Sequence, residues 1–439
     1  MPKAATMIRE RISDRSARIC VVGMGYVGLP LAIEFARAGY KVTGIDVDPK
    51  KVAGIRAGRS HIQDVTSADV REMVKKRRLT AQDTYRACHR FDAILICVPT
   101  PLSKTKDPDI SYIVAAVEKI GPQLRAGQLI VLESTSYPGT TEEVIRPRLE
   151  SGGLKVGKDF FLAFSPERVD PGNTKYTTHN TPKVVGGTTR TCTRVAVHLY
   201  RQAVEQVHQV SSTQVAEMIK LLENTFRAVN IGMVNEIVLM CEKLGIDAWE
   251  VIDGAATKPF GFMPFYPGPG IGGHCIPLDP HYLSWKLKTL NYSARFIELA
   301  SEINGQMPQE VVRRATDLLN GKKKSVNGSK VFVLGVTYKK DTADVRESPA
   351  LDVIRLFEQR GARISYHDPY TPKLSIEGGR SYKRSALNKT SLGTADLVLV
   401  ITDHSSYDYD QIVRDSTLIL DTRNATRNVR RGRSKIRKL

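Results

Sequence analysis

The chain has 439 residues, 41% of them hydrophobic, and carries 65 lysines and arginines against 46 aspartates and glutamates, a net charge of +19. At roughly 100–200 residues per domain, this length predicts two to four domains, and the hydrophobic content excludes a wholly disordered chain. The apolar runs are shorter than the roughly 18 residues that cross a bilayer, and residues 1–18 lack a signal-peptide core, so we expect no membrane insertion. Six cysteines without a CxxC pair disfavour a disulfide framework. These features indicate a cytoplasmic enzyme.

The first half of the chain alternates apolar, β-branched runs with helix-length segments. We predict strands at 18–22, 42–46, 91–98 and 129–132, and a helix at 29–38. Strands that alternate with helices are typical of βαβ units and a parallel sheet.

A long helix is predicted over 213–243, which contains no proline and a single glycine. Its apolar residues recur every three or four positions, at Val215, Met218, Leu222, Phe226, Val229 and Met233. At a rise of about 1.5 Å per residue the helix would be about 46 Å long, enough to bridge two domains or to form a subunit interface.

The C-terminal third returns to the α/β pattern. Helix is expected around 297–319, with an interruption near Pro308, and a Gly/Lys-rich break follows at 321–329. Beyond the break we predict strands at 330–336, 363–366, 395–401 and 417–421 and a helix at 349–359. The sequence therefore predicts a second α/β domain.

A dinucleotide signature occupies the first predicted strand–helix turn. Gly23, Gly25 and Gly28 form GxGxxG, which allows a tight turn, close approach of the backbone to a pyrophosphate, and helix–strand packing. Asp46 closes the next strand, where a carboxylate accepts from both ribose hydroxyls and repels a 2′-phosphate. The pattern favours NAD over NADP, although the motif alone does not distinguish nicotinamide from flavin.

The segment 265–279 combines four glycines and three prolines around one thiol, Cys275. Such a composition predicts a fixed irregular loop that brings backbone N–H groups and the thiol close to a ligand. The alternatives are an inert buried cysteine, a zinc site with His274 and His281, and a Cys–His dyad. Zinc is disfavoured because adjacent ligands are poorly placed and no second sulfur pair lies nearby.

Three polar residues of the long helix, Glu217, Lys220 and Asn224, lie three and four positions apart and share a face. This face is either a solvated stripe or a source of donors for a developing oxyanion, supplied by Lys220 and Asn224. The sequence leaves both interpretations open.

Taken together, the segments resemble the UDP-glucose/GDP-mannose dehydrogenase family over almost the whole chain. The resemblance rests on GMGYVG at 23–28, VPTP at 98–101, ESTSYPGTTE at 133–142, SPERVDPGN at 165–173, AEMIKLLENTFRAVNIGMVNE at 216–236, PGPGIGGHCIPLDP at 267–280 and YKKDTADVRESPAL at 338–351. It implies a mixed α/β fold with a Rossmann-type NAD-binding domain at 1–210 and a central helical dimerisation domain with the catalytic cysteine loop at 211–325. A C-terminal UDP-binding α/β domain with a basic tail is implied at 326–439.

The implied activity is NAD-dependent oxidation of the C6 alcohol of a UDP-sugar to a carboxylate, for surface polysaccharide biosynthesis, by a homodimer or higher homo-oligomer. SPERVDPGN is similar to the branch that acts on UDP-N-acetylglucosamine. The UDP-glucose branch typically carries NPEFL at this place, and the N-acetylmannosamine branch has a leucine before the proline. We therefore expect UDP-N-acetylglucosamine, with UDP-glucose and UDP-N-acetylmannosamine as alternatives.

By the same resemblance, Cys275 is the nucleophile that forms a thiohemiacetal and then a thioester. Lys220 and Asn224 match donors to the oxygen that gains charge. The remaining catalytic matches are Asp279 in proton transfer with Lys220, Glu167 as general acid or base in hydrolysis, and Thr135 as the residue that holds water.

The resemblance also implies ligand contacts. Those to NAD are Gly23, Met24, Gly25, Tyr26, Val27, Gly28, Asp46, Lys51, Thr100, Ser134, Thr135 and Arg346. Those to the UDP-sugar are Glu167, Arg168, Val169, Asp170, Lys220, Asn224, Tyr266, Gly268, Gly270, Gly272, Tyr338, Lys339 and Arg423. A family arginine that reaches in from the partner subunit has no clear match near Lys258, and no metal is expected.

Two other functions are compatible with parts of the sequence. One is a two-electron dehydrogenase in which Cys275 is structural. The other is a nucleic-acid-binding protein on a retained fold, suggested by the net charge of +19. The charge lies mostly in 424–439 with +7, 71–78 with +4, 1–18 with +3 and 322–324 with +3, outside the motifs. We therefore interpret 424–439 as a peripheral tail whose deletion leaves turnover largely intact, and we expect no nucleic-acid partner.

Overall fold

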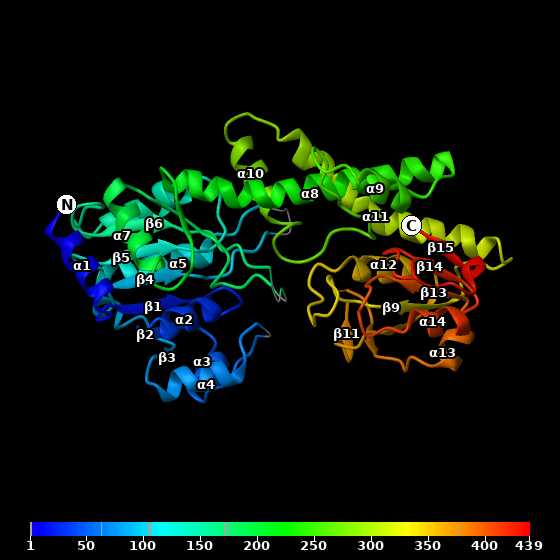
Figure 1. Ribbon diagram of the computed structural model, residues 1–439, viewed down its shortest axis with the longest axis horizontal. Helices are drawn as coiled ribbons and strands as arrows, with labels where there is room; N and C mark the ends of the chain where they lie inside the picture. The colour runs from blue at the N-terminus through cyan, green and yellow to red at the C-terminus, as the bar shows by residue number, and fades with distance from the viewer. Residues whose placement is uncertain (1, 63, 104–106, 171–172, 174, 377) are drawn as a thin grey trace. The chain divides into compact units, whose positions relative to one another are not determined.

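The computed structural model describes residues 2–439 except 63, 104–106, 171–172, 174 and 377. It consists of two compact units (Figure 1). The first unit contains Met1–Glu223 and His281–Tyr292, and the second contains Asn224–Pro280 and Ser293–Leu439. The boundaries at 210 and 325 predicted from the sequence stay a prediction.

The first unit is built on an eight-stranded sheet in the order β3-β2-β1-β4-β5-β6-β7-β8. Its strands are β1 (Arg18–Val22), β2 (Lys41–Ile45), β3 (Leu79–Gln82), β4 (Ala93–Ile96), β5 (Leu129–Leu132), β6 (Phe161–Phe164), β7 (Lys183–Gly187) and β8 (Val207–Gln209). The predicted parallel arrangement is confirmed from β3 through β6, but β7 pairs antiparallel with β6. The order 3-2-1-4-5-6 is that of a Rossmann fold.

Helices connect these strands and cover the sheet with apolar side chains. They are α1 (Lys3–Ser13), α2 (Gly28–Arg37), α3 (Pro49–Arg56), α4 (Ser67–Lys75), α5 (Ser111–Ile120), α6 (Arg146–Glu150) and α7 (Arg190–Tyr200). Strands β4, β5 and β6 are buried at every position, as expected for a sheet covered on both faces. Because β1, β2, β4, β5 and β6 run parallel, the segments that follow them all leave the sheet at one edge, where ligands bind in this fold.

The second unit contains a five-stranded sheet in the order β10-β9-β13-β14-β15. Its strands are β9 (Lys330–Leu334), β10 (Arg363–His367), β13 (Leu397–Val400), β14 (Ile419–Asp421) and β15 (Ile436–Lys438), and a separate hairpin joins β11 (Lys373–Ser375) to β12 (Ser381–Lys383). Alternate residues face opposite sides, so Val331 and Val333 join one core cluster and Phe332 and Leu334 another. The predicted second α/β domain is confirmed.

Helices flank this sheet on both faces (Figure 1). The first cluster includes residues of α11 (Arg295–Asn320) and α12 (Pro349–Gln359), and the second includes residues of α13 (Lys389–Gly393) and α14 (Tyr409–Asp415). The unit also contains α9 (Ala248–Ala255). The two remaining helices, α8 (Thr213–Leu244) and α10 (Asp279–Lys288), each contribute residues to both units.

The long helix is confirmed as α8, one residue longer than predicted. The predicted interruption near Pro308 is wrong, because α11 continues through this residue. An interior proline costs a helix about 3 kcal/mol. Met307, Pro308, Val311 and Val312 are all buried, and this packing offsets the lost backbone hydrogen bond.

The interpretation of 424–439 as a peripheral tail is wrong. Strand β15 pairs with β14, Val429 and Leu439 are buried, and the Thr426 amide donates to Asp421 at 2.8 Å. Val429, Ile436 and Leu439 stand among seven basic residues in this segment, so its charge concealed a strand. Among the helices of the described residues, none combines the length and hydropathy of a membrane span.

Candidate active site

The glycines of GxGxxG meet the requirements that the motif predicts. Gly23 has φ +90°, and a Cβ there would overlap the carbonyl oxygen of Cys97, while a Cβ on Gly28 would overlap that of Gly23. Apart from Gly25 and its two chain neighbours, no heavy atom of the described residues lies within 4 Å of a Cβ built on Gly25, so the backbone there is open to a ligand. The turn leads directly into α2, whose N-terminal N–H groups and dipole favour a phosphate.

Asp46 lies directly after β2 and is 7% exposed. Its carboxylate accepts from the backbone N–H of Met24 and of Asp48, each at 2.9 Å, and Lys51 Nζ lies 3.5 Å away. The structure thus joins the glycine turn to the acidic residue. These residues fit a dinucleotide with free ribose hydroxyls.

Thr100, Ser134 and Thr135 follow β4 and β5 at the same edge of the sheet. The Ser134 hydroxyl donates to the carbonyl of Val98 at 2.8 Å, which ties the two segments together. The carbonyl of Thr100 accepts from the Tyr282 hydroxyl at 2.9 Å, and Thr135 is half-buried.

Glu167 follows β6 and belongs to a buried network that the sequence did not reveal. Lys183 Nζ lies 3.0 Å from Glu167 Oε2 and 2.6 Å from Glu133 Oε2, and the Tyr200 hydroxyl donates to Glu133. Glu133 directly follows the wholly apolar strand β5, and Lys183 begins the apolar strand β7. A charged residue at the end of a buried strand is the signal that could have identified both.

The substrate-binding candidates next to Glu167 are half-buried. Arg168 forms an ion pair with Glu223 at 2.5 Å and donates to the Pro182 carbonyl at 2.7 Å. The Asp170 carbonyl accepts from the Asn173 amide at 3.0 Å, and Val169 donates its amide to Glu167 at 2.8 Å. The motif positions 171–172 lie outside the described residues.

The polar face of α8 is not a solvated stripe. Glu217 is fully buried and accepts from the amides of Gly139 and Thr141 at 2.6 and 2.9 Å and from the Thr141 hydroxyl at 2.7 Å. Burial raises the pKa of Glu217 to about 7. Because Glu217 accepts from three donors of the 139–141 turn, it stabilises that turn against α8. Lys220 is half-buried.

In the second unit, Asn224 donates its side-chain amide to Asp279 at 2.5 Å, and both residues are buried. Cys275 is the one exposed thiol of the six cysteines, and its carbonyl accepts from the Asp279 amide at 2.8 Å. The structure therefore places the predicted nucleophile and the carboxylate in one turn, with Asn224 bonded to that carboxylate. An inert buried cysteine at 275 is excluded by this exposure.

The glycine loop packs directly on two other predicted substrate residues. A Cβ on Gly268 would overlap Nη1 of Arg423, and a Cβ on Gly272 would lie 2.7 Å from Cβ of Tyr338. Gly270 has φ +132° and packs against Pro349. Each of these glycines admits a neighbour that a side chain would exclude. Burial lowers the pKa of Arg423, which nevertheless stays cationic because an arginine titrates far above neutrality.

Arg346 lies near the cysteine loop within this unit. It forms two bonds to Asp344, at 2.9 and 2.7 Å, and Asp344 Oδ2 lies 3.9 Å from Nδ1 of His274. Burial and then Arg346 lower the pKa of His274. The Lys339 carbonyl accepts from the hydroxyls of Thr337 and Thr342, which shapes the 337–342 turn.

Tyr266 stands before the glycine loop and is 43% exposed. Its ring stacks on Trp249 at 5.4 Å, with the planes 12° apart, and its hydroxyl donates to Asp253 at 2.7 Å. These contacts fix the ring as a flat, partly exposed surface.

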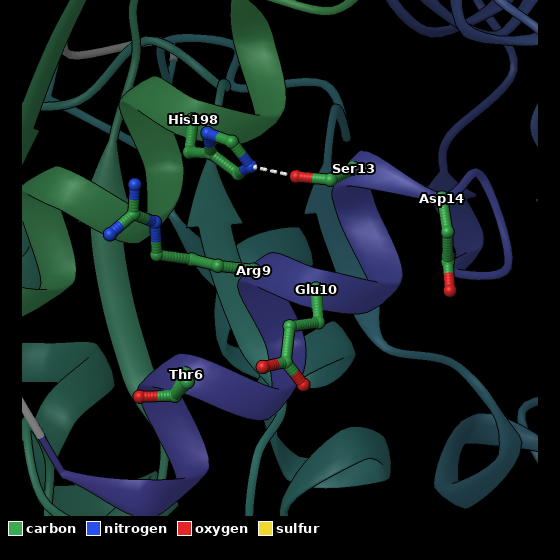
Figure 2. Close-up of a pocket in the computed structure, with 6 residues that line it drawn as sticks. All are labelled: Thr6, Arg9, Glu10, Ser13, Asp14 and His198. Carbon is green, nitrogen blue, oxygen red and sulfur yellow. Dashed lines mark hydrogen bonds between the residues drawn. The ribbon is translucent and has the colours of Figure 1, made fainter.

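A separate pocket of about 500 Å³ is lined by residues of α1, Asp14 and His198 of α7, and none of its lining residues is a predicted site residue. Figure 2 shows its lining residues, with the Ser13 hydroxyl 2.9 Å from His198 Nε2. Burial lowers the pKa of His198, and the neighbouring arginines Arg9, Arg15 and Arg201 add to this effect. Acidic and basic groups are mixed around the pocket, which gives it no clear ligand class.

Three family models match the chain in succession. They are the NAD binding domain of the UDP-glucose/GDP-mannose dehydrogenase family at 17–204, its central domain at 214–306 and its UDP binding domain at 332–428. The matches cover both the dinucleotide turn and the cysteine loop.

Individual relatives agree with the family models. The UDP-N-acetyl-D-glucosamine 6-dehydrogenase of Pseudomonas aeruginosa is 33% identical over 395 residues, which are 90% of this chain and 92% of that protein. The UDP-N-acetyl-D-mannosamine dehydrogenase of Methanococcus maripaludis is 33% identical over 420 residues, 93% of this chain and 92% of that one. The solved structure of the UDP-D-ManNAc dehydrogenase from Pyrococcus horikoshii has a TM-score of 0.87 at 33% identity and covers 96% of this chain and 98% of that chain. The chain belongs to the UDP-glucose/GDP-mannose dehydrogenase family and is a NAD-dependent nucleotide-sugar dehydrogenase.

Proposed function

We propose that the enzyme oxidises the C6 alcohol of UDP-N-acetylglucosamine to the carboxylate, in two steps, for surface polysaccharide biosynthesis. The observation that carries the four-electron reaction is the exposed thiol of Cys275 in the turn that holds Asp279. The choice of sugar is supported by the SPERVDPGN run and by the Pseudomonas aeruginosa relative. UDP-N-acetylmannosamine is the alternative that the other two relatives favour.

The conversion of an alcohol to an acid requires two hydride transfers to NAD and one water. An aldehyde has no leaving group, so the Cys275 thiolate adds to its carbonyl carbon and makes a thiohemiacetal from which the second hydride departs. The resulting thioester is then hydrolysed. Lys220 and Asn224 donate to the oxygen as it gains charge, Asp279 exchanges protons, Thr135 holds the water and Glu167 accepts its proton.

Ligand contacts follow the same proposal. The glycine turn and Asp46 hold the dinucleotide, with Lys51, Thr100, Ser134 and Arg346 as further contacts. Arg423 and Lys339 neutralise the anionic part of the UDP-sugar, and Tyr266, Tyr338 and the 267–272 backbone enclose it.

The test is NADH formation by the purified enzyme with UDP-N-acetylglucosamine, UDP-N-acetylgalactosamine, UDP-N-acetylmannosamine and UDP-glucose, with product acid measured by mass spectrometry. We expect two NADH per sugar consumed and the highest kcat/KM with UDP-N-acetylglucosamine. Cys275→Ala should yield no acid. One NADH per sugar, or normal acid formation by Cys275→Ala, would exclude the thiol mechanism.

We also propose that the enzyme is a homodimer formed through α8. Five large apolar residues of α8 are exposed along one face of the helix: Met218, Leu222, Phe226, Met233 and Met240. Phe226→Asp should convert the dimer to a monomer in sedimentation experiments. Arg227→Asp introduces the same side chain outside this exposed apolar face and should leave the dimer intact. A monomeric wild-type enzyme would refute the proposal. The cytoplasmic location stays a prediction.

A further inference from the structure

Lys183 is a buried lysine with no role in the proposed mechanism. Its side chain is 4% exposed, and its ammonium lies 2.6 Å from Glu133 and 3.0 Å from Glu167. An ammonium removed from water is costly unless it is fully paired. The pairing of Lys183 with two carboxylates at the ligand edge of the sheet therefore calls for an explanation.

The topology of the sheet brings these three residues together. Glu133 leaves the carboxyl end of β5, and Glu167 lies just beyond the carboxyl end of its parallel neighbour β6. Because β7 runs antiparallel to β6, with Gly186 opposite Phe164, its first residue, Lys183, returns to the same edge. The antiparallel pairing of β7 with β6 therefore places the Lys183 ammonium at this edge of the sheet.

The Glu167 carboxylate is held at both oxygens. Oε1 accepts from the amides of Arg168 and Val169, each at 2.8 Å, and Oε2 accepts from Lys183. The side chain keeps 14% of its surface exposed, so it is oriented but still reachable. Three donors stabilise the charged form of this carboxylate, which is the form that can accept a proton.

The titratable groups around Glu167 come from four elements: Lys183 from β7, Glu133 after β5, Cys97 after β4 and Tyr200 from α7. Burial raises the pKa of Glu133 to about 7, and burial also raises the pKa of the Cys97 thiol. Burial acts to raise the pKa of Glu167 as well, but Lys183 and the two amides outweigh it and leave that pKa lowered. Within this network Glu167 is therefore the carboxyl that stays charged, and Glu133 is the one that takes up a proton first.

We propose that Lys183 is a positioning residue whose ammonium keeps Glu167 charged and aims Oε2 for the hydrolytic step, while Glu133 holds the ammonium in place by its own hydrogen bond. The inference rests on the proposed role of Glu167. In that step the water oxygen bonds to the thioester carbon, the bond from that carbon to the sulfur of Cys275 breaks, and a proton of the water passes to Glu167. No electrons are exchanged, and the sulfur leaves as a thiolate.

Two variants and a control test this role. Lys183→Met removes the ammonium at similar length but leaves two buried carboxyls beside each other. The double variant Lys183→Met/Glu133→Gln is therefore included, because it removes one carboxyl together with the ammonium and leaves Glu167 as the single ionisable group of the three. Lys76→Met is the matched control, since Lys76 is an exposed lysine paired with Glu72. The pKa of Glu167 is measured by ¹³C NMR on protein labelled at the glutamate δ-carbons, with the signal assigned by its loss in Glu167→Gln.

We expect the Glu167 titration midpoint to rise in both Lys183 variants and to stay unchanged in Lys76→Met. With UDP-sugar, acid release should slow by roughly 10-fold or more, a part of the roughly 10²–10⁴-fold that a positioned acid or base contributes. The acidic limb of its pH profile should move to higher pH, while KM for both ligands is unchanged. Lys183→Arg, which restores a cation, should recover part of the rate.

An unchanged midpoint in the double variant would overturn the proposal, and so would a raised midpoint with unaltered acid release. The titration requires no substrate. If the wild-type enzyme formed no NADH with any UDP-sugar, the proposed function would fall, and the NMR result would still decide whether Lys183 controls Glu167.

Discussion

The side-chain amide of Asn224, on α8, donates to the carboxylate of Asp279, at the start of α10, over 2.5 Å. Both residues are buried, and the Asp279 amide is bonded to the Cys275 carbonyl. Asn224 thus connects the long helix to the turn that carries the exposed thiol.

Asn224→Ala should impair catalysis more than folding. The substitution removes a hydrogen-bond donor from the buried Asp279 carboxylate. This loss destabilises the charged form of Asp279 and removes a contact that holds the turn with Cys275 in place. We expect kcat for NADH formation to fall at least roughly 10-fold, as in losses of positioned donors. Asn230→Ala on the same helix is the control, because Asn230 bonds only to the Phe226 carbonyl in the described contacts. Equal rates in the two variants would show that the Asn224–Asp279 bond is dispensable.

Glu217→Gln should destabilise the first unit. The carboxylate accepts at both oxygens from the 139–141 turn, and an amide would direct its NH₂ group at one of those donors. A buried donor without a partner costs about 1–3 kcal/mol, and we expect a loss of this size in the free energy of unfolding by urea denaturation. Glu10→Gln, at an exposed position of α1, should be neutral. An unchanged free energy of unfolding in Glu217→Gln would mean that the 139–141 turn does not depend on the carboxylate.

Cys275 should react with iodoacetamide far faster than the other cysteines in the native enzyme. It is exposed, whereas Cys20, Cys88, Cys97, Cys192 and Cys241 are buried. Burial also raises the pKa of Cys88 to about 11, which keeps this thiol protonated and unreactive. Peptide mass spectrometry over a time course provides the measurement, and urea-unfolded protein, in which all six sites react, calibrates it. Comparable rates at a buried site would contradict the structure.

Deletion of 436–439 should lower stability rather than leave it intact. The deletion removes β15 and the buried Leu439, and burial of one leucine alone contributes about 1.5–3 kcal/mol. We expect a lower midpoint of thermal unfolding and less folded protein. Arg430→Gln/Arg431→Gln removes charge from exposed positions of the same segment and should keep the wild-type midpoint. If the charge variant were the less stable one, the basic character and not the strand would be important.

Much of the architecture could be predicted because it depends on local patterns. The glycines at 23, 25 and 28, the strand at 129–132 and the helix at 349–359 are found where apolar periodicity and turn residues indicate them. The long helix was predicted to within one residue, since 32 positions without proline allow little else. Motif resemblance supplied the candidate residues, and the structure brings Gly268, Gly272, Arg423 and Tyr338 into contact within the second unit.

Other features depend on contacts between residues distant in the sequence, which local patterns do not encode. Pro308 suggested a break, yet buried neighbours keep α11 continuous, and the basic residues of 424–439 concealed a strand that only its partner β14 defines. The sequence places Glu217 on a polar face of the long helix. Its burial depends on donors at 139–141, which lie 76 or more positions away in the chain.

Residue type and spacing along the chain are enough to predict the two α/β regions, the dinucleotide turn and the cysteine loop. The position of Lys183 beside Glu133 and Glu167 depends instead on how the strands pair in the folded protein. Glu133 and Lys183 are 50 positions apart in the chain, and strand pairing brings them together. Carboxylates at the ends of two other strands offset the desolvation cost of the buried ammonium.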